Sequence, residues 1–259
     1  MAGHGPITDL FELDHGLSVP VVAPSGAATR GFGGHVAAIG LAAAYATVAA
    51  DKRVHHAHVE FLRPTTAGRI TRATVHDTSD GRTLARRVVE VGHPGEKPAA
   101  VAFATFLRRD PAGLDYQPGP ITPPPTIDDT EVVHTSPVMV RAVPQPNGSA
   151  LQKVWIRPRV VPLADDPRLH DCALLFASDL TVLWTTLTVH GRDLDERHSA
   201  LATTSHSVWF HRDVDLGSWL LYDQEAVSTT HGLGQASGRM WTASGDLAAT
   251  VMQVGTLGR

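Results

Sequence analysis

Hydrophobic positions in the first hundred residues predict one buried helix followed by four strands. Residues 35–50 are rich in Ala and Leu, lack proline and are apolar on nearly every side, which is typical of a buried helix. Runs of β-branched and aromatic residues follow, separated by turn sequences such as Ser79-Asp80-Gly81. We therefore predict strands over 56–62, 70–77, 83–91 and 99–107.

The second half repeats this order of elements. It contains an apolar helix over 171–188 and then strands over 203–211, 219–226, 234–242 and 248–257. Because the strands run together and do not alternate with helices, the pattern predicts an α+β fold. Phe61 and Arg63 match Phe210 and Arg212 at one constant spacing, which indicates a duplication. Two unrelated α+β domains are the alternative.

A proline-rich stretch separates the halves. Prolines interrupt both helices and central strands, so we predict an extended linker over residues 109–140. The chain then divides into an N-terminal domain, 1–108, and a C-terminal domain, 141–259. The prolines that carry this prediction are Pro111, Pro118, Pro120, Pro123, Pro124 and Pro125.

Charge and composition exclude several classes of protein. The net charge of −4 argues against binding to nucleic acid or to a membrane surface, since both usually need a basic face. No run of 18 apolar residues occurs, so nothing is expected to span a membrane. Residues 1–14 carry acids and no long apolar core, so we expect no signal peptide and a cytoplasmic location. The single cysteine, Cys172, lies in an apolar run and is expected to be a buried, inert thiol.

Two polar residues stand out in apolar surroundings. Asp179 interrupts the second helical run, where a carboxylate is costly unless it is hydrogen-bonded and where burial raises its pKa. Gln253 lies in the apolar strand 248–257, where a buried amide needs partners. Its counterpart in the first half, aligned through the hairpin glycines, is Phe103, interpreted as a core residue. A polar site present in one half only would produce this difference.

Short motifs in a fixed order resemble the acyl-CoA thioesterase II family of double-hotdog enzymes, from about residue 28 to Arg259. The first half carries Phe32-Gly33-Gly34-His35-Val36, Phe61-Leu62-Arg63-Pro64 and Asp80-Gly81-Arg82, and the second carries Ala177-Ser178-Asp179-Leu180, Trp209-Phe210-His211-Arg212 and Trp219-Leu220-Leu221-Tyr222.

The resemblance implies two tandem hotdog domains, in each of which an antiparallel sheet wraps a long helix, and hydrolysis of fatty acyl-CoA. It also implies three catalytic positions, which fall on Asp179, Thr203 and Gln253. Asp179 would be the general base that activates water. No G-x-S-x-G nucleophile elbow occurs, which favours direct attack by water.

The glycine pair Gly33-Gly34 opens the first predicted helix, where free backbone N–H groups point outward. Many single-domain hotdog thioesterases pair such glycines with an acid eight residues into the helix of the other subunit. Here the first helix has Leu41 at that position, whereas the second has Asp179 but begins at Asp171 without glycines. We therefore expect one composite site, with oxyanion donors from Gly33 and Gly34 and with His35 beside them as a further substrate-binding residue.

Two residues depart from the family pattern: Ser205 stands where the family has Asp, and His35 where it has Gln. The 15 histidines include His55-His56-x-His58, but neighbouring strand residues point to opposite faces, and the family uses no metal or other cofactor. A non-catalytic acyl-CoA binder and a hotdog dehydratase or hydratase are the alternatives. The dehydratase pattern H-x-x-x-G-x-x-x-x-P is absent from the sequence. A homo-oligomer is expected, because exposed sheet edges are natural contact sites.

Overall fold

The computed structural model describes residues 17–20, 29–109, 113–119, 124–128, 130–134, 137–159, 166–192 and 201–258. Residues 1–14, considered above for a signal peptide, lie outside this part, as do Pro111, Pro120 and Pro123 of the predicted linker.

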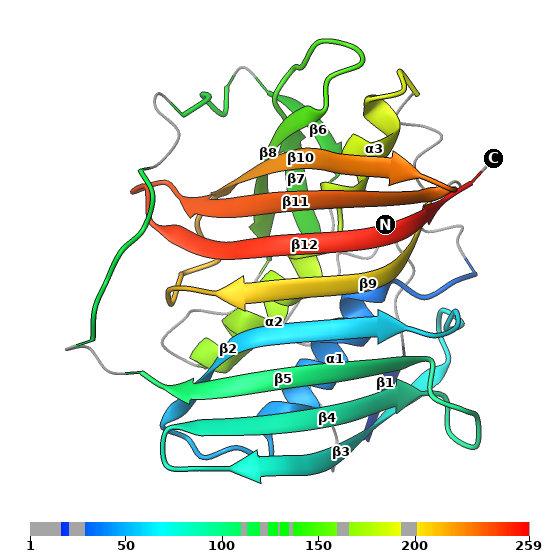
Figure 1. The fold of residues 1–259 in the computed structure, drawn as a ribbon, viewed down its shortest axis with the longest axis vertical. Helices are drawn as coiled ribbons and strands as arrows, with labels where there is room; N and C mark the ends of the chain where they lie inside the picture. Colours follow the sequence, from blue (N-terminus) through cyan, green and yellow to red (C-terminus); the bar gives the residue numbers. More distant parts are fainter. Residues whose placement is uncertain are drawn as a thin grey trace.

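The described strands form one antiparallel sheet of 12 strands (Figure 1), confirming the α+β class. In chain order they are β1 (Leu17–Pro20), β2 (Lys52–Phe61), β3 (Ile70–Asp80), β4 (Leu84–Gly92), β5 (Ala100–Arg108), β6 (Glu131–His134), β7 (Val138–Ala142), β8 (Leu151–Pro158), β9 (Leu201–Phe210), β10 (Leu220–Thr230), β11 (Leu233–Thr242) and β12 (Leu247–Leu257). Their order across the sheet is β1-β3-β4-β5-β2-β9-β12-β11-β10-β8-β7-β6.

The two halves join edge to edge through β2 and β9, where His56 pairs with Trp209 and Glu60 with Ser205. The order β3-β4-β5-β2 on one side mirrors β9-β12-β11-β10 on the other, as a duplicated unit related by a pseudo-two-fold axis would be. The helices α1 (Gly33–Tyr45) and α2 (Pro167–Ser178) lie together on one face of the sheet, behind it in Figure 1. The core fills the space between these helices and the sheet.

The linker prediction is wrong over its last part. Residues 131–134 and 138–142 form β6 and β7, which pair with each other, and β7 also pairs with β8. Val138 and Val140 are fully buried, and the β-branched residues of this segment favour a strand despite the neighbouring prolines.

The pairing register corrects the alignment of the two halves. Phe61 lies opposite Ala100, and Phe210 lies opposite Ala249, so the residue equivalent to Gln253 is Ala104. Phe103 is 48% exposed and faces away from the helices, so its interpretation as a core residue is wrong. The error arose because the one-residue difference between the halves lies in the hairpin with Gly95 and Gly245, whereas the strands themselves stay in step.

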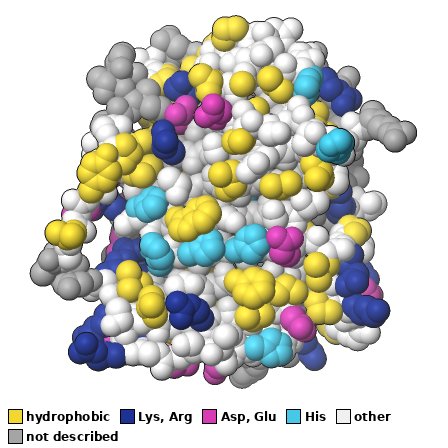
Figure 2. All heavy atoms as spheres, in the orientation of Figure 1, with side chains coloured by type: hydrophobic (Ala, Val, Ile, Leu, Met, Phe, Trp, Pro, Cys, Tyr) yellow, Lys and Arg dark blue, Asp and Glu magenta, His cyan; other side chains and the backbone are white. Residues whose placement is uncertain are grey.

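The outer face of the sheet carries a row of histidines across its middle (Figure 2). The His56 ring stacks on Trp209 with centroids 4.6 Å apart, and His58 Nδ1 lies 2.7 Å from Ser207 Oγ. These rings have aromatic and hydroxyl partners and do not converge. No group of three His, Cys, Asp or Glu side chains that could hold a metal ion occurs among the described residues.

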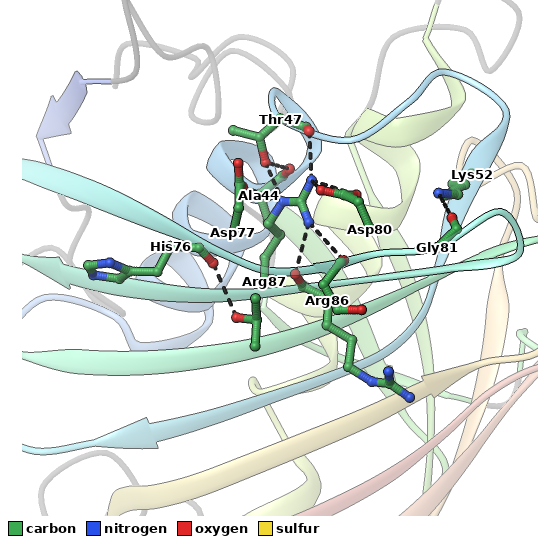
Figure 3. Close-up of polar contacts among 11 residues, drawn as sticks. Ala44, Thr47, Lys52, His76, Asp77, Asp80, Gly81, Arg86 and Arg87 are labelled. Carbon is green, nitrogen blue, oxygen red and sulfur yellow. Dashed lines mark hydrogen bonds and ion pairs between the residues drawn. The ribbon is translucent and has the colours of Figure 1, made fainter.

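A buried arginine, Arg87, forms hydrogen bonds that connect the segment after α1 to the hairpin of β3 and β4 (Figure 3). The side chain of Arg87 is 2% exposed, yet its Nη2 donates to both carboxylate oxygens of Asp80 at 3.0 Å and to the backbone oxygen of Thr47 at 2.8 Å. Its Nε lies 2.8 Å from Asp77 Oδ1 and 2.8 Å from Thr47 Oγ1. A planar guanidinium can serve these acceptors together, which a single ammonium cannot.

Replacing Arg87 with methionine is expected to lower the free energy of unfolding by about 1–3 kcal/mol, because the hydrogen bonds that connect Thr47 to the exposed carboxylates of Asp77 and Asp80 are lost. Arg87→Lys, which keeps the charge and lacks the fork, should recover less than half of the loss. Urea denaturation of the three proteins measures this. A methionine variant with an unchanged midpoint would show that the contacts contribute nothing net.

Candidate active site

The base candidate Asp179 lies at the end of a helix and not inside one. Helix α2 begins after Asp166, whose side chain accepts a hydrogen bond from Arg168 N, and it stops at Ser178. Its continuation is broken into η2 (Val182–Trp184) and α3 (Thr185–Thr188), so the single helix predicted over 171–188 is wrong. The Tyr222 hydroxyl donates to the carbonyl of Ser178 at 3.0 Å and replaces the next helical hydrogen bond.

The structure brings the three predicted catalytic residues together. Gln253 Nε2 donates to Asp179 Oδ1 at 2.7 Å and to Thr203 Oγ1 at 2.6 Å. Thr203 Oγ1 donates to the same carboxylate oxygen at 3.2 Å. Because β9 and β12 are neighbours and α2 crosses behind them, residues far apart in the sequence meet at one point.

The environment of Asp179 sets its protonation. The residue is 8% exposed, and burial raises the pKa of its carboxyl to about 7. The hydrogen bonds from Thr203, from the backbone N–H of Gly34 and from Gln253 favour the charged form and lower the pKa, as does the charge of Arg30. The carboxyl therefore titrates near neutral pH, where a general base is most effective.

The glycine pair lies directly against this carboxylate. The N–H of Gly34 is bonded to Asp179, so this donor holds the base in place. A Cβ added at Gly33 would lie 2.9 Å from Asp179 Oδ2, and one at Gly34 would lie 2.4 Å from the carbonyl oxygen of Phe176. Only glycines allow the start of α1 to approach α2 and the carboxylate this closely.

The side chain of His35 lies elsewhere than expected. It is fully buried, with its ring centroid 6.0 Å from that of Phe176, and it is not among the residues that line the cavity at Asp179. The expectation that His35 contacts substrate is therefore dropped. As the third residue of α1, its side chain is directed into the helix pair and away from the opening.

A cavity of about 340 Å³ opens onto Asp179, Thr203 and Gln253. This volume falls within the range of small-molecule sites. Its walls are mainly apolar and include Phe32, Val36, Phe61, Leu180, Leu183 and Trp184. Two arginines, Arg30 and Arg63, belong to its lining and are exposed. The cavity thus combines a mainly apolar wall, a carboxylate and two exposed arginines.

The pseudo-equivalent region of the other half lacks the same set of polar residues. Ala104 occupies the position of Gln253, and the buried Asp171 in the second turn of α2 is paired with Arg53, Nη2 to Oδ2 at 2.7 Å. The hydroxyl of Tyr45 also donates to Asp171. This ion pair satisfies the acid with partners that leave it no role as a base. The geometry thus favours one site in each chain.

Sequence reasoning missed three contributors to the site. It did not foresee the Gly34 N–H bond to Asp179, the charge of Arg30 acting on that carboxyl, or the contact of Ser178 Oγ with His206 Nε2 at 2.8 Å behind the site. The sequence carried two signals for these contributors: the predicted pairing of Gly33-Gly34 with Asp179, and the adjacency of Ser178 to Asp179.

No helix in the described part of the chain is long and apolar enough to cross a membrane.

Comparison with known proteins identifies the family. Residues 23–107 match the acyl-CoA thioesterase N-terminal domain, and residues 128–256 match the acyl-CoA thioesterase family. An acyl-CoA thioesterase II structure from Mycobacterium marinum is 35% identical, with a TM-score of 0.76 over 88% of this chain and 91% of that chain.

Two further matches agree. Acyl-CoA thioesterase 2 of Haemophilus influenzae is 27% identical over 87% of this chain and 87% of its own length. A hotdog-fold structure from Alicyclobacillus acidocaldarius, 21% identical, covers 96% of this chain and 95% of that chain with a TM-score of 0.76, which confirms the double-hotdog fold. The chain therefore belongs to the acyl-CoA thioesterase II family of thioester hydrolases.

Proposed function

We propose that this chain hydrolyses fatty acyl-CoA to the free acid and coenzyme A, with Asp179 as the general base for direct attack by water. The observation that carries the proposal is a carboxylate with a pKa raised to about 7 in the lining of a mainly apolar cavity, held by Thr203 and Gln253. The apolar wall suits an acyl chain, and the carboxylate in the same lining suits a reaction at the thioester to which that chain is attached.

The two oxygens of Asp179 have different tasks in this proposal. Oδ1 accepts hydrogen bonds from Gln253 and Thr203, which fix the carboxylate. Oδ2 lies on the side of Gly33, which lines the cavity, and it accepts a proton from the attacking water. The water oxygen bonds to the thioester carbon, the C–S bond then breaks, and the departing thiolate takes the proton back from Asp179.

The developing oxyanion needs a donor that is not already engaged. Gly34 N–H is bonded to Asp179, so the proposed donor is the N–H of Gly33, the first residue of α1, which has no acceptor within its own helix. Domain one then supplies the donor and domain two the base. This division explains why one composite site forms from two similar halves.

A single turnover in H₂¹⁸O tests the mechanism. With excess enzyme over acyl-CoA, direct attack puts one ¹⁸O into the free acid and leaves Asp179 unlabelled. An acyl-enzyme on Asp179 that water attacks at the aspartyl carbon would instead give an unlabelled first product and a labelled carboxylate, and one attacked at the acyl carbon would be trapped by hydroxylamine. Binding of acyl-CoA without release of coenzyme A, from folded protein, would favour the non-catalytic binder.

The exposed Arg63, which lines the cavity, is proposed to bind phosphates of coenzyme A. Arg63→Ala is then expected to raise KM about 3–10-fold for acyl-CoA and to leave KM for the matching acyl-pantetheine, which lacks the nucleotide, nearly unchanged. Arg69→Ala is the matched control, because Arg69 is exposed but pairs with Glu96 and does not line the cavity. An equal rise for both substrates would contradict this role.

The expected homo-oligomer and cytoplasmic location stay predictions. The strands at the two margins of the described sheet, β1 and β6, offer backbone groups for a contact between copies.

A further inference from the structure

Two buried polar atoms behind the site lie on residues that face each other across one strand pair. Gln253 of β12 pairs with His206 of β9, and both side chains are almost fully buried, 1% and 0% exposed. The interaction with Gln253 raises the pKa of His206 against the effect of burial, which lowers it to about 3. Gln253 Oε1 and His206 Nδ1 are both buried, and neither has a hydrogen-bond partner among the described residues, the other of the two included.

The hydrogen bonds of Gln253 fix which end of its amide faces the carboxylate. Both hydrogens of Nε2 are used, one on Asp179 Oδ1 and one on Thr203 Oγ1. The amide oxygen is then left as the unpaired end of the side chain, where it is desolvated and needs a donor. The only side chain opposite it in the pairing register is His206.

Which ring nitrogen of His206 carries hydrogen decides whether Gln253 Oε1 has a donor. The ring is neutral at physiological pH, because burial lowers its pKa to about 3, so only one of its nitrogens carries hydrogen. With hydrogen on Nδ1, the ring donates to Gln253 Oε1, and Nε2 accepts from the Ser178 hydroxyl 2.8 Å away. With hydrogen on Nε2, two acceptors would face each other in a dry interior.

Ser178 has a competing acceptor. Its Oγ also lies 2.9 Å from the carbonyl oxygen of Leu175, and one hydroxyl hydrogen serves only one of the two partners. Donation to Leu175 would leave Gln253 Oε1 without a donor. Donation to His206 would give every side chain in the hydrogen-bonded series Ser178, His206, Gln253 and Asp179 a partner. The arrangement with the fewest unpaired buried groups is favoured.

We propose that His206 is a positioning residue: as its Nδ1–H tautomer, selected by Ser178, it donates to Gln253 Oε1 and keeps the amide N–H groups of Gln253 turned toward Asp179 and Thr203. This role rests on the proposed function of Asp179. Without His206 the amide can rotate by half a turn at almost no steric cost. Its oxygen would then face the carboxylate, raise the pKa of Asp179 and remove one partner that orients the base.

Three substitutions separate the donor from the bulk of the ring. His206→Asn places an amide N–H near the former Nδ1 and is expected to keep kcat within about threefold of wild type. His206→Gln reaches the region of Nε2 and Ser178 but offers no donor to Gln253, and His206→Phe offers none at all. Both are expected to lower kcat at least tenfold, about the value of one hydrogen bond to a charged site. They should also move the acidic limb of the kcat/KM profile to higher pH.

The same substitutions in a Gln253→Ala background test whether His206 acts through Gln253. If it does, His206→Phe causes no further loss there, since the two residues form one unit. Loss that persists undiminished, or an asparagine variant as impaired as the phenylalanine variant at equal melting temperature, would overturn the proposal and indicate a packing role.

A measurement on the unsubstituted protein needs no activity. The ¹⁵N spectrum of histidine-labelled protein, with the His206 signals assigned by their loss in His206→Asn, reports which nitrogen carries hydrogen. The Nδ1–H form is expected, and the Nε2–H form would overturn the proposal. Asp179→Asn measured in parallel keeps the two hypotheses apart: full activity in that variant refutes the proposed function, while the tautomer still decides the role of His206.

Discussion

Asp179→Asn is expected to lower kcat about 10²–10⁴-fold with little change in KM, because the variant keeps the shape of the side chain and loses the proton acceptor. Release of coenzyme A from acyl-CoAs of graded chain length measures the effect. Gln253→Ala should have the same direction and a smaller size, since it removes one bond to the base and leaves the base present. An asparagine variant with most of the wild-type kcat/KM would show that Asp179 is not the base.

The pH profile provides an independent check on Asp179. Its carboxyl must be ionised to accept a proton, and burial raises its pKa to about 7. We therefore expect kcat/KM of the wild-type protein to rise about tenfold per pH unit below 7 and to level off above it. Gln253→Ala should move this limb upward, because the lost hydrogen bond favoured the charged form. A limb near pH 4 would contradict the proposed environment.

Ionisation of the Asp179 carboxyl lowers the stability of the folded protein. The folded pKa lies above the ordinary value of 3.8, so the carboxyl stabilises the fold below pH 3.8, and this contribution is lost as the pH rises through 7. Asparagine at this position does not titrate. Between pH 5 and pH 8 the unfolding free energy of Asp179→Asn should therefore rise, relative to that of the wild-type protein, by on the order of 2 kcal/mol. Such a cost is typical of a catalytic group kept in an apolar setting.

Much of the fold was visible in the sequence because local patterns carry it. The apolar helix at 35–50 and the strand runs of each half correspond to α1, β2–β5 and β9–β12, with ends shifted by a few residues. Asp179 and Gln253 were visible for a related reason: a polar residue in an apolar run is costly and needs an explanation.

Contacts between distant segments were not visible. Helix α2 ends at Ser178, where the hydroxyl of Tyr222 on β10 donates a hydrogen bond to the Ser178 carbonyl. No residue near Ser178 in the sequence indicates this partner. The family pattern did place Gly34 near Asp179, but as a donor to the oxyanion, and its bond to the carboxylate itself was not predicted. Residues 131–134 and 138–140 were predicted as linker because prolines lie around them. The pairing of β7 with the edge of β8 was not predicted, because a local pattern does not indicate a partner strand.

Adjacent glycines at the start of α1 should respond differently to the same substitution. Gly34→Ala puts a methyl group 2.4 Å from the backbone oxygen of Phe176 and 2.6 Å from the ring of Phe32. A backbone oxygen cannot move aside as a flexible side chain does, so α1 must shift away from α2. We expect a loss of about 3 kcal/mol or more in unfolding free energy, together with the Gly34 N–H bond to Asp179 and most of kcat.

Gly33→Ala is the matched control, because its methyl group meets a side chain. It would lie 2.9 Å from Asp179 Oδ2 and 3.3 Å from the end of the Phe61 ring, both of which can rotate by a few tenths of an ångström. Unfolding in urea should therefore be nearly unchanged, whereas kcat should fall at least about tenfold, since Oδ2 is displaced from the attacking water. Equal stability losses in the two variants would show that the glycines serve only to pack the helices. A Gly33→Ala enzyme with full kcat would show that Oδ2 does not contact the water.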